Sequence, residues 1–237
     1  MRRATLVLAG FGLIVAAPRA LAQGPRGRDR MAMVAEQIAG RGVRDTATLR
    51  AMRTVPRHEF VPAALSDEAY GDHPLPIGFG QTISQPYIVG YMTELLGLGP
   101  RSRVLEIGAG SGYQAAILAE IAGEVYTVEI IGALATSAEE RLRRLGYGRV
   151  QVRRGDGFEG WKDAAPFDAI IVTAAAGFVP PPLVEQLKPG GRLVIPVGSV
   201  YGAQNLVLVG KARDGSLTTR TLLPVRFVPL VRTRQIR

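Results

Sequence analysis

A short apolar strand that runs directly into three closely spaced glycines constrains the fold of this chain more than any other feature. Residues 103–113 read Arg-Val-Leu-Glu-Ile-Gly-Ala-Gly-Ser-Gly-Tyr, and the glycines are Gly108, Gly110 and Gly112. Glycine lets the chain turn sharply out of a strand and lets a ligand lie against backbone N–H groups at the start of the next helix. The pattern predicts a nucleotide-binding turn followed by a helix over residues 113–121.

The residues around the turn discriminate between two classes of cofactor. NAD-binding proteins use the pattern G-x-G-x-x-G, whereas here Tyr113 stands in the place of the third glycine. Glu106 precedes the turn, where an acid suits the sulfonium and amino groups of S-adenosyl-L-methionine better than a pyrophosphate. Glu129 ends the next strand-like run, where a carboxylate can accept hydrogen bonds from both hydroxyls of a ribose. The sequence favours S-adenosyl-L-methionine, although Glu129 could also be an ordinary solvated acid.

The chain downstream of the turn alternates between strands and helices. Strands are expected at residues 104–107, 125–129, 150–153, 169–173 and 192–197, with helices at 113–121, 133–145 and 182–187. Apolar strands that alternate with helices form a parallel sheet covered on both faces. Residues 205–211 and 216–223 are expected to form a hairpin that turns at Asp214-Gly215. The predicted fold class is α/β: a doubly wound, mostly parallel sheet of the class I methyltransferase type, with a C-terminal antiparallel hairpin and an N-terminal helical segment.

The segment upstream of the turn is predicted to contain helices and one long loop. Helices are expected at residues 31–38, closed by Gly40, and at residues 46–54, stopped before Pro56. Residues 70–80 are rich in proline and glycine, and a loop of this length without periodicity is usually functional or disordered. A third helix is expected over residues 85–96, with Ser84 as its N-cap and Pro86 in its first turn.

The first residues are typical of a secretory signal peptide. Met1-Arg2-Arg3 precedes an apolar run that ends at Ala20-Leu21-Ala22, a site of the kind that signal peptidase cuts. We expect residues 1–22 to be removed and residues 23–237 to form one methyltransferase domain, with a helical substrate segment at 28–97 and a cofactor-binding core at 98–237. The protein is then expected to be exported, to the periplasm, or to stay cytoplasmic if the leader does not function.

The composition excludes several classes of chemistry and narrows the partners. The chain has no cysteine, so disulfides, thiolate metal sites and a cysteine nucleophile are impossible, and its two histidines are too few for a histidine-based metal site, so no metal is expected. The chain has a formal net charge of +9, but its basic residues are scattered rather than clustered. This pattern argues against a nucleic acid as a partner. The apolar run of the leader is short for a membrane span. We expect no stable membrane span after cleavage, and a monomer.

Several motifs together resemble the protein-L-isoaspartate O-methyltransferase family. The run Gly80-Gln-Thr-Ile-Ser-Gln-Pro-Tyr-Ile-Val89 lies upstream of the glycine turn, as in that family. Further similar segments are residues 55–62, 155–157, 167–175, 187–191, 195–198 and 225–230. The resemblance covers residues 31–231 and implies transfer of a methyl group from S-adenosyl-L-methionine to the free α-carboxylate of L-isoaspartyl residues in damaged proteins and peptides. The ester collapses to a succinimide, whose hydrolysis regenerates some normal aspartyl linkage.

The resemblance also assigns roles to individual residues. Ser84 falls on the active-site serine of the family, next to Thr82 and Ile83, which we expect to contact the substrate. The expected cofactor-binding residues lie in the glycine turn, at the ends of the first two core strands, and in the segment that faces adenine: Glu106, Gly108, Gly110, Gly112, Glu129, Asp156 and Gly157. Two simpler interpretations stay open, because Ser84 could be only a helix cap and Asp156 only a turn residue.

Two further pairs of residues are expected beside the substrate. Thr173 and Ala174 follow the fourth core strand, and open α/β sheets bind ligands in the crevice at the carboxyl ends of their strands. Val197 and Gly198 lie at the end of the fifth strand and are expected to present backbone groups to the peptide. Two features depart from the family: Ala109 stands where many members have threonine, and most bacterial relatives lack an export signal.

The expected chemistry agrees with the absence of a strong base. A carboxylic acid with a pKa near 4 is already ionised at neutral pH, so the catalyst has to orient the acceptor rather than deprotonate it. Two rival functions remain at this stage. One is an S-adenosyl-L-methionine-dependent methyltransferase with another acceptor, such as RNA or a small metabolite, because the fold does not choose among acceptors. The other is an exported relative that binds the cofactor without turnover.

Overall fold

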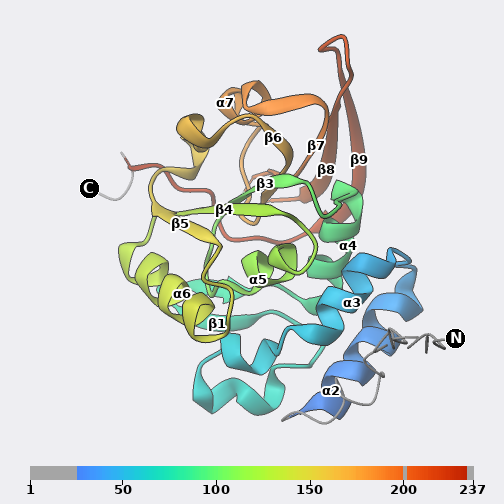
Figure 1. Cartoon of the computed structure of the whole chain (residues 1–237), viewed down its shortest axis with the longest axis vertical. Coiled ribbons are helices and arrows are strands. Elements are labelled where there is room, and N and C mark those ends of the chain that lie inside the picture. The colour runs from blue at the N-terminus through green and yellow to red at the C-terminus, as the bar shows by residue number, and fades with distance from the viewer. Residues whose placement is uncertain (1–25, 200–201, 234–237) are drawn as a thin grey trace, which may run out of the picture.

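The centre of the molecule is a seven-stranded sheet with the strand order β5-β4-β3-β6-β7-β8-β9 (Figure 1). The computed structural model describes residues 26–199 and 202–233, so the predicted leader lies outside the described residues. The strands are β3 (Arg103–Ile107), β4 (Glu124–Glu129), β5 (Gln151–Arg154), β6 (Phe167–Val172), β7 (Leu187–Gly198), β8 (Gln204–Lys211) and β9 (Leu217–Val225). The first five are parallel, whereas β8 is antiparallel to both of its neighbours. The predicted fold class is confirmed.

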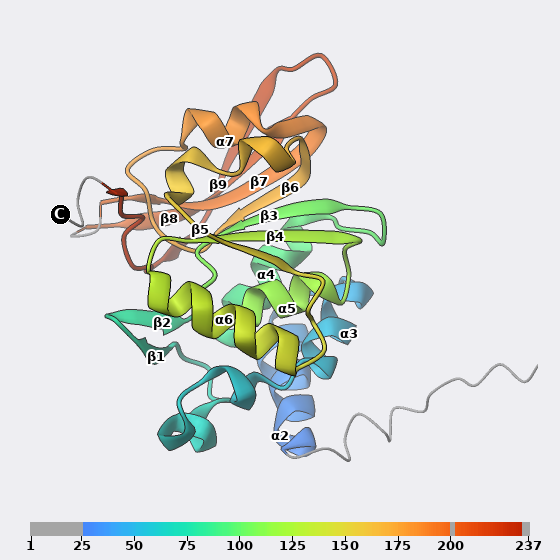
Figure 2. The same cartoon turned by 60° about the vertical axis from the view of Figure 1, so that its left-hand side comes forward.

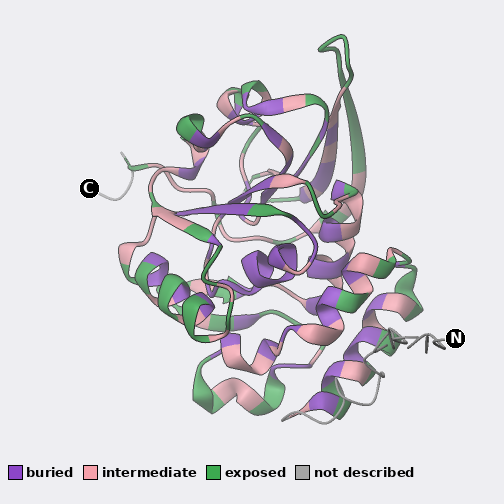
Figure 3. Ribbon diagram, in the orientation of Figure 1, coloured by how far each residue is buried: buried purple, intermediate pink, exposed green. Residues whose placement is uncertain are grey.

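Alternate residues of the strands pack into two separate cores, one on each face of the sheet. In β3, Val104 belongs to one core and Leu105 to the other, as the two-residue period of a strand requires. Helices α4 (Pro86–Leu96), α5 (Tyr113–Ala119) and α6 (Gly132–Arg144) lie on one face, while α7 (Pro181–Glu185) lies on the opposite face (Figure 2). Every residue of α5 is buried (Figure 3), so this helix has no solvent-facing side.

The segment before the sheet wraps around the face that carries α4 and α5. It begins with α2 (Gly27–Ala32), which continues through a π-helical turn (Met33–Ile38) and a 3-10 turn (Ala39–Arg41), and α3 (Thr46–Thr54) follows. The predicted stop at Gly40 was wrong, because Gly42 takes the left-handed conformation that ends the helix, with a φ of 102°. Helix α3 has the predicted bounds, and Asp45 caps it by accepting a hydrogen bond from the Thr48 N–H at 2.7 Å.

Residues 70–80 differ from the unstructured loop that the sequence suggested. Strands β1 (Leu75–Gly78) and β2 (Gln81–Ile83) form a small antiparallel hairpin that turns at Phe79 and Gly80, both with positive φ. The hairpin was missed because two strands of three and four residues are too short to show an alternating pattern. Helix α4 starts at Pro86 with Gln85 as its N-cap, so the prediction that Ser84 caps it was wrong.

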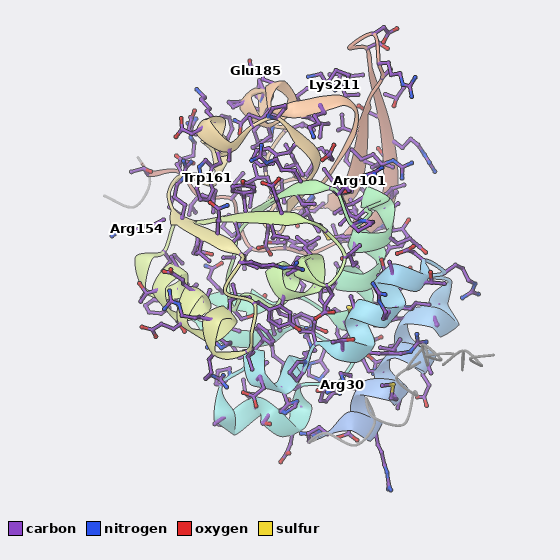
Figure 4. All side chains as sticks on the ribbon, in the orientation of Figure 1. Arg30, Arg101, Arg154, Trp161, Glu185 and Lys211 are labelled. Atoms are coloured by element: carbon purple, nitrogen blue, oxygen red, sulfur yellow. The ribbon has the colours of Figure 1, made fainter. Side chains whose placement is uncertain are left out.

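The C-terminal hairpin forms as expected and extends the sheet away from the glycine turn. Strands β8 and β9 are joined at residues 212–216, and their outer end protrudes from the molecule (Figure 1). The ammonium group of Lys211 donates to the carbonyl oxygens of Val184 and Leu187 at 3.0 and 2.9 Å and so ties β8 to the end of α7. Figure 4 labels Lys211 and Glu185, which is the last residue of α7. No helix in the described part of the chain is long and apolar enough to cross a membrane.

Candidate active site

One cavity contains the glycine turn and lies at the carboxyl ends of the central strands; it is called the main cavity below. Strand β3 pairs with β4 on one side and with β6 on the other, and such a reversal of strand order is where open α/β sheets bind ligands. The cavity is lined by residues 81–84, the glycine turn, the ends of β4 and β6, and residues 228–231. Residues 228–231 are called the carboxyl-terminal strap below. The sheet therefore brings together segments that lie far apart in the sequence.

The glycine turn keeps its backbone close to the cavity. Gly108 has a φ of +95°, and a Cβ there would lie 2.4 Å from the hydroxyl oxygen of Thr173. That hydroxyl donates to the carbonyl oxygens of Ile107 and Gly108 at 3.0 and 2.8 Å. A residue larger than glycine would displace Thr173, which braces the turn from β6. Position 108 therefore requires glycine both for its backbone conformation and for its close contact.

Glu129 connects the glycine turn to the start of α6. One carboxylate oxygen accepts a hydrogen bond from the Gly110 N–H and the other accepts one from the Ile131 N–H, both at 2.9 Å. The side chain lies in the cavity lining and is 6% exposed. Glu129 is therefore not an ordinary solvated acid at a strand end. Its charge-assisted hydrogen bonds fix the two backbone segments on either side of the cavity.

Glu106 is a buried carboxyl group without a hydrogen-bond partner in the described part of the chain. It is fully buried, and neither of its side-chain oxygens has a partner there. Burial raises the pKa of Glu106 to about 8; the negative charge of Glu129 adds to the rise, whereas the nearby Thr127 hydroxyl opposes it. A carboxyl group is costly to bury without a partner. Because Glu106 lines the cavity, a cationic group bound there would provide the missing interaction.

Ser84 is held in place by a buried arginine from a distant part of the sequence. The Arg57 guanidinium donates to the carbonyl oxygen of Ser84 and to that of Ala69, both at 2.7 Å. Arg57 is fully buried and lies 5.0 Å from the ring centroid of Tyr113, the first residue of α5. Burial lowers the pKa of Arg57 to about 10, so the group remains charged at neutral pH. One cation thus contacts both the serine segment and the helix that follows the glycine turn.

A second hollow adjoins the main cavity at Ser84. It is lined by Pro74, by residues of the segment 82–88, by Thr173 and by residues 224–228. Thr82, Ser84, Thr173 and Val228 line both hollows, so the two are continuous. This second hollow is called the outer groove below. The main cavity contains the glycine turn, Glu106 and Glu129, whereas the outer groove runs from Ser84 toward the end of β9.

Comparison with known proteins identifies the family. The family model described as protein-L-isoaspartate(D-aspartate) O-methyltransferase matches residues 28–235. The chain belongs to this family. A relative from Opitutus terrae, named protein-L-isoaspartate O-methyltransferase, is 57% identical over 232 residues, which cover 98% of this chain and 99% of the relative. A second, from Nitrosospira multiformis, is named protein-L-isoaspartate O-methyltransferase 1 and is 60% identical over 203 residues, which cover 85% of this chain and 86% of the relative.

Solved structures of the family share the fold. A protein-L-isoaspartate O-methyltransferase superposes with a TM-score of 0.75 at 29% identity over 86% of this chain, which spans 65% of that chain's length. A second structure, from Plasmodium falciparum, is described as a complex with S-adenosyl-L-homocysteine. It has a TM-score of 0.74 and 25% identity, and the match covers 86% of this chain and 99% of the other. The predicted resemblance to the family is confirmed.

The structure gathers most of the sequence-predicted site residues around the main cavity. Those in its lining are Thr82, Ile83, Ser84, Glu106, Gly108, Gly110, Glu129, Gly157, Thr173 and Ala174. Gly112 is not in the lining; its left-handed backbone forms the N-cap of α5 and lies close to Leu142 of α6. Their individual roles in binding remain predictions, but their convergence from five segments of the chain agrees with a single site.

Besides Gly112, three predicted residues do not line the cavity. The Asp156 carboxylate accepts hydrogen bonds from the N–H groups of Phe158 and Thr233 at 3.0 and 3.1 Å, so it caps a 3-10 turn and binds the chain just beyond the strap. Val197 and Gly198 pair with β8, and the Gly198 N–H donates to the Ala176 carbonyl oxygen. The structure places neither residue in the main cavity or the outer groove. Their contact with the cofactor or the peptide stays a prediction without geometric support.

Two parts of the site were missed in the sequence. Arg57 lies in the family-like run 55–62, but a buried arginine cannot be distinguished from a surface one by sequence pattern alone. The strap lines the cavity because Leu230 and Val228 pair with Ala175 through backbone hydrogen bonds of 2.8 Å. The run 225–230 resembled the family, which was the available signal. The strap consists of apolar residues and Arg57 is one of many arginines in the chain, so residue type alone gave no signal.

Proposed function

We propose that this chain transfers a methyl group from S-adenosyl-L-methionine to the free α-carboxylate of L-isoaspartyl residues in damaged proteins and peptides, which begins their repair. The proposal rests on the family membership and on one structural observation. A cavity with two buried acidic side chains, Glu106 and Glu129, and a glycine turn opens past Ser84 into a groove on the surface. The main cavity suits a cationic nucleoside, and the outer groove suits an acceptor presented by a peptide.

The residues of the main cavity fit S-adenosyl-L-methionine. When bound, this cofactor supplies an electrophilic methyl group carried on a positively charged sulfonium. Glu106, whose oxygens have no partner in the described residues, would accept hydrogen bonds from its cationic amino group. Glu129 lies at the end of β4, where a carboxylate suits ribose hydroxyls, and Gly157 lies in the lining at the end of the third core strand. The relative from Plasmodium falciparum is described with the demethylated form of the same cofactor.

Ser84 orients the acceptor at the junction of the two hollows. Its hydroxyl makes no hydrogen bond within the described part of the chain, and the residue lines both the main cavity and the outer groove. It directly precedes the N-cap of α4, and the positive end of a helix favours a carboxylate. Because Arg57 fixes the Ser84 carbonyl, the position of this segment does not depend on the substrate. The acceptor needs no base, since a carboxylate is ionised at neutral pH.

Cofactor titration combined with a methyl-transfer assay tests the function. We expect the purified protein to bind S-adenosyl-L-methionine and to transfer labelled methyl to a peptide that contains L-isoaspartate. The same peptide with normal aspartate is the matched control and should stay unlabelled. Label in RNA or a small metabolite, but not in the isoaspartyl peptide, would favour another acceptor. Binding without any transfer would favour a relative that only binds the cofactor.

Export is a separate part of the proposal. It is supported by the two arginines that follow Met1, the apolar run and the small residues at Ala20 and Ala22. We expect the mature protein to begin near Gln23 and to be found in the periplasm. Mass spectrometry of the N-terminus, together with fractionation of the producing cells, measures both. Full-length protein in the cytoplasmic fraction would contradict export without affecting the proposed activity.

A further inference from the structure

The outer groove has a distinctive charge. It is lined by eleven residues from four segments of the chain: Pro74, Thr82, Ser84, Gln85, Ile88, Thr173, Pro224, Val225, Arg226, Phe227 and Val228. Arg226 is the only ionisable residue among them, and no carboxylate lines the groove. The surface next to the proposed acceptor position therefore has a positive charge that is not balanced within the groove.

The guanidinium of Arg226 is available to a ligand. The residue is exposed, and within the described ranges 26–199 and 202–233 it has no hydrogen bond, salt bridge or ring contact. Other arginines near the site differ in this respect. Arg232, beyond the strap, contacts the carboxylates of Asp156 and Glu159 at 3.5 and 2.5 Å. Arg57 is bound to two carbonyl oxygens. Among the residues that line the groove, Arg226 is thus a cation without a partner in the described part of the chain.

One acid is linked to the groove lining through Gln85, and it is already paired with another arginine. Asp72 is reached from the groove through Gln85, whose side-chain amide donates to an Asp72 carboxylate oxygen at 2.9 Å. The other oxygen of Asp72 forms an ion pair of 3.0 Å with Arg41. The charge of Asp72 is therefore already balanced by an arginine on its own side of the molecule. A peptide in the groove meets a positive potential.

We infer that Arg226 selects client peptides with an acidic side chain near the isoaspartyl residue. The inference rests on the proposed function, because the acceptor at Ser84 places the neighbouring peptide residues in the outer groove. Consecutive residues of an extended peptide rise by about 3.3 Å, so side chains within a few residues of the acceptor reach the groove wall. A carboxylate there pairs with the guanidinium, which presents its donors in a planar fork. Arg226 acts as a specificity-determining residue rather than a catalytic one.

The size of the effect follows from the exposure of the pair. Ion pairs at a solvated surface are weak, and their strength corresponds to a preference of about 2- to 5-fold in kcat/KM for an acidic over a basic neighbour. The preference should appear in KM, because the acidic side chain does not touch the reacting atoms. It should also decrease at high salt, since the screening length falls from about 10 Å at 0.1 M to about 3 Å at 1 M ionic strength.

Charge reversal at Arg226 tests the inference. Three isoaspartyl peptides are compared, which differ only in carrying Glu, Gln or Lys at a neighbouring position, and each neighbouring position is examined on both sides of the isoaspartyl residue. With Arg226→Glu, we expect the preference to invert, so that the ratio of acidic to basic peptide changes by roughly tenfold relative to the unaltered protein. Arg226→Gln should abolish the preference, and this variant decides the question if the glutamate variant does not fold.

Arg213→Glu is the matched control. Arg213 is an exposed arginine in the turn between β8 and β9, outside the groove lining, and its reversal changes the net charge of the protein by the same amount. This control should keep the preference of the unaltered protein. Equal use of all three peptides by the unaltered protein, or the same change in both variants, would overturn the role of Arg226. Failure to methylate even the Gln peptide would instead refute the proposed function, and the inference with it.

Discussion

The two sides of the site are built in different ways. On the cofactor side, the glycine turn, Glu106 and Glu129 come from two neighbouring strands within about 25 residues of sequence, and both acidic side chains are buried. On the acceptor side, residues 82–84, Thr173 and the segment 224–228 come from distant parts of the chain, and Thr82 and Arg226 are exposed. The first side is a local motif supported by the sheet. The second side exists only once the whole chain has folded.

The difference indicates that cofactor binding and selectivity for client peptides belong to different sides of the site. A buried, preformed cavity suits a cofactor that is the same in every turnover, whereas an open groove suits client peptides that vary in sequence. The two sides are not independent, since Arg57 contacts the carbonyl of Ser84 and the ring of Tyr113. The following predictions ask how far a change on one side leaves the other unaffected.

Removal of the Ser84 hydroxyl should affect the acceptor side alone. With Ser84→Ala we expect kcat to fall by roughly 100-fold or more, as for the loss of one orienting donor, while the dissociation constant of S-adenosyl-L-methionine changes less than about twofold. Steady-state kinetics and calorimetric titration measure the two quantities. Thermal stability should be nearly unchanged, because Gln85 and not Ser84 is the N-cap of α4. Parallel losses in turnover and cofactor affinity would place the serine on the cofactor side.

Replacement of Glu129 should have the opposite effect. Glu129→Ala removes the acceptor for the Gly110 and Ile131 N–H groups, and hydrogen bonds to a charged group contribute about 1.5–3 kcal/mol. We expect cofactor affinity to fall by roughly 30-fold, measured by calorimetric titration. Glu124→Ala is the control, because this glutamate lies exposed at the other end of β4, where it pairs with Arg103. Unaltered affinity in the Glu129 variant would remove this carboxylate from the cofactor site.

The buried carboxyl group of Glu106 should make the stability of the cofactor-free protein depend on pH. Its pKa is raised from 4.5 to about 8, so between these values the folded state keeps a proton that the unfolded state releases. Stability should therefore fall as the pH rises through this window. Glu106→Gln should remove this pH dependence of stability. It should also raise the melting temperature at pH 8, by roughly 2–4 °C for each kcal/mol gained in the free energy of unfolding.

Thermal unfolding of both proteins at pH 5 and pH 8 measures this dependence. Glu124→Gln serves as the control, since that carboxylate is exposed and its pKa is lowered, chiefly by a hydrogen bond from Tyr126. Cofactor affinity should fall in Glu106→Gln even though the protein becomes more stable at pH 8. Identical pH slopes in Glu106→Gln and the unaltered protein would show that the carboxyl group is not desolvated as described.

The smallest effect is expected just beyond the strap, at Arg232. Arg232→Ala removes the ion pairs to Asp156 and Glu159 and a contact of 3.9 Å with the Phe158 ring centroid. These groups are partly exposed, so we expect only a 2- to 5-fold faster release of S-adenosyl-L-homocysteine, measured by competition kinetics. Arg143→Ala, which removes an exposed pair with Glu139 on α6, is the control. A larger change in peptide KM than in cofactor release would assign the strap to the acceptor side.

The sequence predicted elements where local physics decides the structure. The strands of the core and helix α3 were found because periodic apolar residues, caps and proline stops act within a few residues. The β1–β2 hairpin and the true N-cap of α4 were missed. Leu75 and Ile83 of the hairpin are buried in the core among residues from distant parts of the chain, and Gln85 rather than Ser84 takes the capping position of α4. Propensity is a weak guide where such long-range contacts decide the outcome.

For the site, the sequence alone determined the glycine turn, the two acids that flank it and the serine motif, and hence the family and its cofactor. Only the tertiary structure decided that Asp156 binds the chain beyond the strap, that Val197 and Gly198 lie away from the cavity, and that Arg57 and Arg226 flank the serine segment. The physical reason is that a cofactor motif is built from consecutive backbone groups, whereas the acceptor groove is built from segments joined only by packing and hydrogen bonds across the fold.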